Sequence, residues 1–176
     1  RELGLPPERV LINASHCHGS VHSDVAARTI EAVKTAWKQL VPVKVGAGRG
    51  TESRVSENRR MLLKSGREAD VRHAYSLPAD DAVVSVGPID PVIGLLRLDR
   101  YDGTTLAIVY NFACHPIQGV PGGGNTADMI AFSSAALETG FGHDCLALFL
   151  QGCGGDINPA RYKDVSQPRD AEPLGQ

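Results

Sequence analysis

Short apolar runs bounded by polar or turn-forming residues recur along the chain, and they predict a β-sheet at its core. Six runs have the length and composition of strands, and they span residues 9–14, 41–48, 82–86, 93–99, 106–112 and 146–150. Asp102-Gly103 stands between two of these runs, and this pair is typical of a β-hairpin turn. The run at residues 9–14 is followed by a polar loop and then by a helical pattern, so residues 9–40 are predicted to form a strand, a loop and a helix.

Two stretches have helical periodicity. Apolar residues from Ala26 to Leu40 recur at alternating spacings of four and three, and Ser23-Asp24 just before them is typical of a helix N-terminus. A second helix is predicted from Ala127 to Leu137, with Asp128 near its start and Gly140 as its C-cap.

The order of these elements predicts the fold class α/β, with a mixed α+β fold as the alternative, and in either case a sheet core with flanking helices. Residues 50–80 interrupt the pattern with charges and with breakers such as Gly66 and Pro78. We expect this stretch to be a functional loop or only locally ordered. The 176 residues are enough for a single domain of ordinary size.

Composition and charge exclude several classes of function. The net charge of −2 and the absence of a Lys/Arg-rich stripe make nucleic acid and anionic membranes poor partners, and an aromatic content of 5% argues against a base-stacking platform. No apolar run approaches the roughly 18 residues of a transmembrane helix. An enzyme and a binding or structural domain remain as hypotheses.

Three of the predicted strands run into loops that carry reactive side chains, and such loops gather at one edge of an α/β sheet. In the first, His16 and His18 point to opposite faces if the segment is extended, so both reach one metal only if the backbone turns there. In the second, Pro116 favours an extended conformation for His115. In the third, the glycines of residues 152–159 either leave backbone N–H groups to bind an oxyanion or serve a tight turn. A structural role for each histidine is the alternative.

Four cysteines are present without a CxxC pair, which argues against a thiolate zinc site; they are Cys17, Cys114, Cys145 and Cys153. Free, partly buried thiols are the favoured interpretation, and two disulfides are the alternative. Gly122-Gly123-Gly124 lacks the Lys-Ser/Thr of a phosphate-binding loop and is predicted to be a flexible loop.

Six short blocks of sequence span about residues 8–162 and follow one another in a set order; they are residues 10–18, 57–60, 90–91, 96–99, 111–116 and 155–159. Taken together, they resemble the neutral/alkaline ceramidase family, zinc-dependent amidases that cleave the N-acyl bond of ceramides. The blocks include a strand leading into the His16-Cys17-His18 loop and an Asn58-Arg59 pair, and it is the ordered set, not any single block, that carries the resemblance.

The resemblance implies that His16 and His115 are zinc ligands and that His18 faces the substrate amide as a hydrogen-bonding or acid/base group. It implies that Arg59 binds the substrate oxygen and stabilises developing negative charge, and that Gly155-Asp156 lines the scissile centre. Zinc would lower the pKa of a bound water toward ~7 and so provide a nucleophile. The implied substrate is an N-acyl, ceramide-like lipid, with a secreted or periplasmic location and peripheral contact with a membrane surface.

The chain departs from the family pattern at two points. Asn158 stands where the family has a serine, and since an amide is no nucleophile, a scheme with water as the nucleophile is retained, with Asn158 as a hydrogen-bonding member of the catalytic set. No motif matches the family's further zinc ligands, a Glu and a Tyr. Residues 1–176 are therefore expected to be a single unit of a larger catalytic domain that continues beyond both ends, and to be inactive alone.

Three alternatives remain open at this stage. Asn158 motivates a non-catalytic binding or structural domain that retains a ceramidase-like shell, and a hydrolase of a different N-acyl substrate is the nearest enzymatic alternative. A phosphate-ester hydrolase with a metal pair has least support, because only Asp156 and Asp128 are placed to bridge metals.

Overall fold

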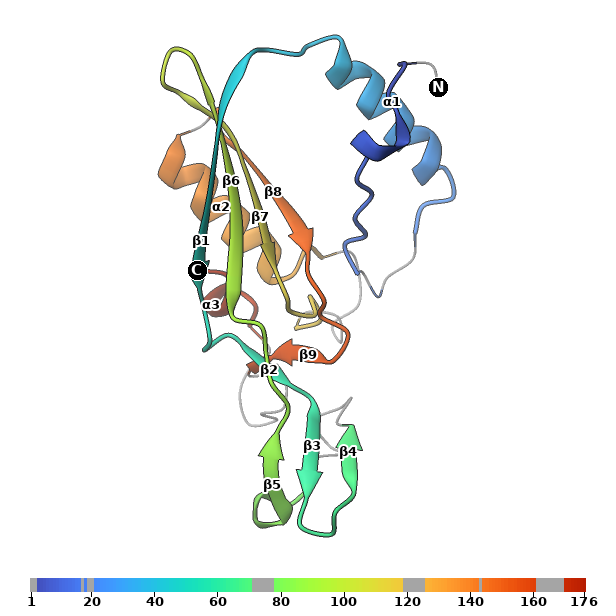
Figure 1. The fold of residues 1–176 in the computed structure, drawn as a ribbon, viewed down its shortest axis with the longest axis vertical. Helices are drawn as coiled ribbons and strands as arrows, with labels where there is room; N and C mark the ends of the chain where they lie inside the picture. Colours follow the sequence, from blue (N-terminus) through green and yellow to red (C-terminus); the bar gives the residue numbers. More distant parts are fainter. Residues whose placement is uncertain are drawn as a thin grey trace.

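A four-stranded sheet forms the centre of the computed structural model, which describes residues 3–16, 18, 21–70, 78–118, 126–142, 144–160 and 170–176. The order of its strands is β1-β6-β7-β8 (Figure 1). Their bounds are β1 Val43–Thr51, β6 Val92–Arg100, β7 Thr105–Phe112 and β8 Leu146–Gln151. β6 is antiparallel to both β1 and β7, whereas β7 and β8 run parallel. The predicted fold class, α/β with helices flanking a sheet, is confirmed.

Turn and cap residues set the boundaries of the central elements. Gly103 has a φ of +91° in the turn between β6 and β7, so the predicted hairpin is confirmed. The second predicted helix is α2 (Met129–Phe141), and the Asp128 carboxylate accepts a hydrogen bond from the Met129 backbone N–H at 2.8 Å. The prediction of Gly140 as the C-cap is wrong, because the helix continues to Phe141 and Gly142, with a φ of +106°, ends it.

Helix α2 connects β7 to β8 and covers one face of the sheet. The main apolar cluster under it contains Ile108, Tyr110, Cys145 and Ala147, with Leu95, Leu137 and Phe149 packed against them. The Tyr110 hydroxyl lies 2.7 Å from Ser133 Oγ and 2.9 Å from Ser134 Oγ, which fixes the helix on the sheet. The short helix α3 (Glu172–Gly175) packs beside α2.

Two smaller sheets contain three short strands from residues 50–80, where the sequence predicted a functional or only locally ordered loop, and one strand that confirms the run predicted at residues 82–86. Strands β3 (Arg60–Leu63), β4 (Glu68–Asp70) and β5 (Val83–Val86) form one sheet in the order β4-β3-β5, and β2 (Ser56–Asn58) pairs with β9 (Ile157–Pro159) in the other. The 3-10 turn η3 (Asp80–Ala82) leads into β5. Over its described residues, the stretch 50–80 is therefore not structureless: β3 pairs with the nearby β4 and with β5, and β2 pairs with the distant β9.

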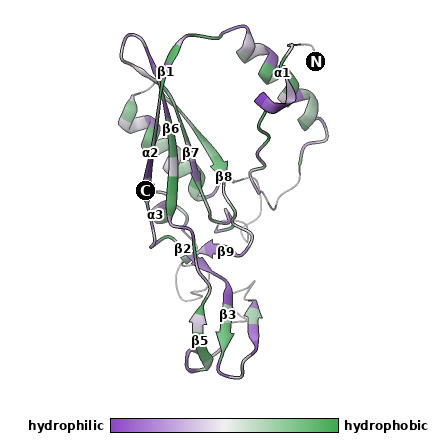
Figure 2. Ribbon diagram, in the orientation of Figure 1, coloured by the Kyte–Doolittle hydropathy of each residue, from purple (hydrophilic) through white to green (hydrophobic). Residues whose placement is uncertain are grey.

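The N-terminal arm departs most from the sequence prediction. Residues 10–16 follow the 3-10 turn η1 (Pro7–Arg9) without forming a strand, so the predicted strand at residues 9–14 is wrong. In the described part of the arm, no backbone ladder joins it to β8; instead, the side-chain amide of Asn13 bonds both backbone groups of Gln151. The predicted helix is confirmed as α1 (Val25–Trp37), but none of its residues is buried. Figure 2 shows hydrophobic residues on α1 and along β8.

Among the helices of the described ranges, none is long and apolar enough to cross a membrane. The glycine run at residues 122–124 lies outside the described residues.

Candidate metal centre

Three of the chain's six histidines lie together: His16, His18 and His115. One nitrogen from each ring falls within 4.8 Å of the other two. The His115 ring centroid lies 4.2 Å from that of His16 and 5.2 Å from that of His18, and the His16 and His18 centroids are 5.4 Å apart. This is the spacing of side chains that can share one metal ion.

A turn of the backbone at His16 makes this arrangement possible. His16 has a φ of +53°, which is unusual for a residue other than glycine. Both rings can reach one metal only if the chain turns there, and the structure meets that condition. His18 is therefore a third candidate ligand. This role is an alternative to the substrate-facing role that the resemblance implied for it.

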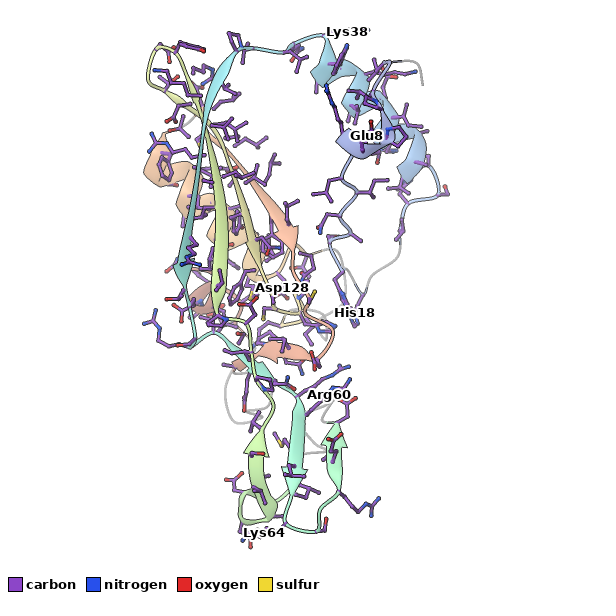
Figure 3. All side chains as sticks on the ribbon, viewed as in Figure 1. Glu8, His18, Lys38, Arg60, Lys64 and Asp128 are labelled. Carbon is purple, nitrogen blue, oxygen red and sulfur yellow. The ribbon has the colours of Figure 1, made fainter. Side chains whose placement is uncertain are left out.

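The ends of β7 and β8 carry the two halves of the cluster. These strands are parallel neighbours, so their C-terminal ends lie at the same edge of the sheet. His115 follows β7, and its backbone N–H donates to the Ile157 carbonyl at 2.8 Å. On the other side, the Asn13 amide bonds the backbone N–H and carbonyl of Gln151, at the end of β8, at 2.9 and 3.0 Å. Asn13 thereby holds the arm that carries His16 and His18, whose tip is marked by His18 in Figure 3.

His115 is suited to bind a cation as a neutral imidazole. Its side chain is buried, and its Nδ1 atom has no hydrogen-bond partner. Burial, together with the neighbouring His16, His18 and Arg59, lowers the pKa of His115 to about 4. The ring is therefore unprotonated near neutral pH, which is the form that coordinates metals.

Arg59 lies at the junction of β2 and β3, close enough to His115 for its charge to affect that ring. Its backbone N–H donates to the Asp156 carbonyl at 2.8 Å, which joins β2 to the loop before β9. The largely buried guanidinium forms an ion pair with Asp70, with 3.0 Å between Nε and Oδ1. The angle at the Nε–H group is too poor for this contact to be a hydrogen bond. Asp70 thus orients the cation at the edge of the site.

The Gly-Asp loop is packed against β7 more tightly than an anion cradle would be. A Cβ on Gly152 would lie 2.9 Å from the Phe112 carbonyl carbon and oxygen, so this glycine is needed for close approach of two backbones. The N–H groups of Gly152 and Gly154 already donate to carbonyls at 2.9 and 2.8 Å. Neither N–H group is free to bind an oxyanion, whereas Gly155 has open space around it.

The Asp156 carboxylate, which the resemblance placed at the scissile centre, is engaged by its neighbours. It accepts from Arg60 Nε at 3.1 Å and from the Asn58 side-chain amide at 3.4 Å. Figure 3 shows Arg60 at the start of β3. A pocket of about 670 Å³ lies beside this ion pair and is lined by residues that include Asn58, Gly87 and Cys153.

Two buried amides lie on the segments that flank His115. Asn158, in β9, is fully buried, and neither polar atom of its side chain has a hydrogen-bond partner. Gln118, three residues after His115, is also fully buried, and neither polar atom of its side chain has a hydrogen-bond partner. It was not among the site residues predicted from the sequence, although its closeness in sequence to His115 could have indicated it. Buried amides without partners are costly in a folded protein, so both are candidates for contact with a ligand.

The thiols follow the favoured interpretation where they are described. Cys114 and Cys145 are buried and free, and Cys153 is exposed and free, whereas Cys17 lies outside the described residues. Burial raises the pKa of the Cys114 thiol to about 12, so it is not a nucleophile near neutral pH.

The fold, though not the sequence, matches solved structures. The neutral ceramidase from Pseudomonas aeruginosa aligns with 83% of this chain at a TM-score of 0.59 and 18% identity, and a ceramidase complexed with C2 aligns with 81% at 0.58 and 16%. The sequence matches no protein-family model and no curated protein. The matched region covers only 23% and 22% of those two chains. This chain therefore shares its fold with part of the ceramidases and carries a histidine cluster compatible with a metal site at one edge of that fold.

Proposed function

We propose that this chain supplies the metal-binding part of a zinc-dependent amidohydrolase of the ceramidase type, acting on an N-acyl lipid. The observation that carries the proposal is the histidine cluster. His16, His18 and His115 come from two segments about a hundred residues apart, and one ring nitrogen of each lies within 4.8 Å of the other two. The fold that this chain shares with part of two ceramidases supports the reaction class.

The donor set fits zinc. Three imidazole nitrogens are a common set of protein ligands in catalytic zinc sites, which keep one further position open. The buried Nδ1 of His115 lacks a partner in the protein, which is a cost that a bound cation removes. His16 and His18 are exposed, so a substrate could reach the cluster from solvent.

When bound, zinc acts as a Lewis acid toward an amide carbonyl and lowers the pKa of water enough to provide a nucleophile near neutral pH. The protein's own contribution begins with the neutral His115 ring, which burial keeps unprotonated. Arg59, oriented by Asp70, supplies positive charge for the carbonyl oxygen as negative charge develops there. The Asn158 amide supplies a hydrogen-bond donor, but no nucleophile.

A non-catalytic metal-binding domain is the second candidate. It is favoured by the paired state of Asp156 and by the use of the Gly152 and Gly154 N–H groups within the fold, which together remove two of the expected catalytic contacts. Both candidates require the histidine cluster, and they differ in whether the whole protein hydrolyses N-acyl substrates.

The test is the zinc content of the purified chain and of four variants, measured by elemental analysis after dialysis against zinc and then against metal-free buffer. We expect about one zinc per chain, lost in His16→Ala, His18→Ala and His115→Ala. His22→Ala is the matched control, because His22 lies on the same arm and outside the cluster, paired with Asp24. Zinc that is absent from the parent, or is unaffected by all three changes, would overturn the proposal.

The role of His18 follows from the same series. Loss of zinc in His18→Ala makes it a ligand. If His18→Ala instead retains zinc, the same change is made in the protein that includes the rest of the catalytic domain. Loss of N-acyl hydrolysis there makes His18 the acid/base group. Hydrolysis of N-acyl sphingosine and of other N-acyl amines by that protein separates an amidase from a binding domain.

A further inference from the structure

We propose that helix α1 docks onto the uncovered face of the central sheet, with its apolar stripe against the two rows of side chains that α2 leaves exposed. The inference does not depend on the proposed function. It rests on two apolar surfaces of the same chain that both lack a partner among the described residues, and on the short connections between them.

The uncovered face is defined by the register of the four strands. Residues directly opposite each other across paired strands share a face, and two adjacent rows of four are entirely apolar. One row is Ala47-Leu96-Val109-Leu148, and the other is Val45-Leu98-Ala107-Leu146. Val45, Leu96, Leu146 and Leu148 remain 43% to 63% exposed.

The uncovered face of this mixed sheet lacks the polar residues that are typical of a solvated face. Sheets with one face in water usually alternate apolar residues toward the core with polar residues toward solvent. Helix α2 covers one side through Ile108 and Ala147, and the alternate residues Leu146 and Leu148 point to the other. The two rows on this face are apolar instead, which indicates that the face is covered in the folded protein.

Helix α1 has the complementary surface. Ile30, Val33 and Trp37, with Leu40 just beyond the helix end, are spaced to form one apolar stripe, and they are 41% to 67% exposed. A helix of 13 residues is marginal by itself in water, since helices in proteins gain most of their stability from packing an amphipathic face. Figure 2 shows polar and apolar residues alternating around α1.

The connections at both ends of the helix allow this packing. Five residues, 38–42, join α1 to β1, and they span at most about 18 Å when extended, so the helix cannot move far from the sheet. At the other end, Asn13 holds the arm to the end of β8. The occupant of the face is therefore the nearest unpartnered apolar helix, tethered at both ends beside it. Docking also immobilises the segment that carries His16 and His18.

The single tryptophan of the chain reports on this docking, since Trp37 lies in the stripe. The experiment measures the Trp37 emission maximum and its quenching by acrylamide in the 176-residue chain and in Leu148→Glu. Leu62→Glu is the matched control, because Leu62 is similarly exposed but lies in the small β4-β3-β5 sheet. We expect short-wavelength, weakly quenched emission in the parent and in the control, and a shift to longer wavelength with stronger quenching in Leu148→Glu.

Strongly quenched, long-wavelength emission that is identical in all three proteins would overturn the proposal. Sedimentation of the same samples tests the competing occupant: shielding that appears only in a dimer means that a second copy covers the face, and this too overturns it. If Leu148→Glu loses its cooperative urea transition, Val33→Glu replaces it, because a charge on the helix leaves the sheet intact. Val33→Glu must then expose Trp37 in the monomer.

Discussion

Replacement of Gly152 by alanine is expected to destabilise the chain by pushing the loop after β8 away from the end of β7. The added Cβ would lie 2.9 Å from the Phe112 carbonyl carbon and oxygen and 3.0 Å from Ala113 Cα. All three are backbone atoms next to a strand that is paired on both sides, so they cannot move aside as a flexible side chain would. Overpacking of this kind costs about 1–3 kcal/mol.

Urea unfolding, followed by circular dichroism, measures this effect. With a slope of about 2 kcal/mol per M, the midpoint of Gly152→Ala should fall by roughly 0.5–1.5 M. Gly155→Ala is the matched control in the same loop, because a Cβ there meets nothing within 4 Å and its φ is not positive, so its stability should change by less than about 0.5 kcal/mol. Equal midpoints for the two variants would refute the reasoning that Gly152 is required by close backbone approach.

Three further predictions follow from the site. Zinc at about 100 times its dissociation constant should stabilise the chain by about 2.7 kcal/mol and raise Tm by roughly 5–11 °C; scanning calorimetry should find this shift in His22→Ala but not in His115→Ala. Because the pKa of His115 is lowered from its ordinary 6.5 to about 4, the unfolded metal-free chain binds a proton that the folded chain does not, so stability should fall by up to ~3 kcal/mol as pH drops from about 6.5 to 4; a urea midpoint independent of pH over this range, or an equal dependence in His115→Gln, would contradict the assignment. A thiol reagent should label Cys153, which is exposed, far faster than the buried Cys114 and Cys145, whose thiol pKa values are raised chiefly by burial; peptide mapping that finds Cys114 labelled at the rate of Cys153 would count against this.

The central strands could be predicted from the sequence because their signals are local. The runs that became β6, β7 and β8 are rich in leucine, isoleucine and valine, and the Asp102-Gly103 turn identified the hairpin between β6 and β7. The strands in residues 56–70 could not be predicted, since each is three or four residues long and is defined by its partner. The Arg9–Ala14 run has a strand composition, yet it contributes one side-chain amide to β8 and no ladder.

The three histidines of the candidate site were singled out from the sequence, but their geometry was not. His16, His18 and His115 were identified from loops at the ends of apolar runs and from the resemblance to ceramidases. The positive φ of His16 could not be read from the sequence, because histidine rarely adopts it, and it is what adds His18 to the cluster. The ion pair between Arg60 and Asp156 depends on the pairing of β2 with β9, which no local pattern indicated.

The separation of the histidines along the chain gives a bound ion a second consequence, for the order of folding. His16 and His115 are 99 residues apart (115 − 16), so a cation that joins them closes a loop of more than half the chain. The entropic cost of closing a flexible loop grows only by about 0.6 kcal/mol for each doubling of its length, but it is incurred before the contacts of the site form. The sheet that carries His115 should therefore assemble first, and the ion should then act as a reversible cross-link that fastens the N-terminal arm to it.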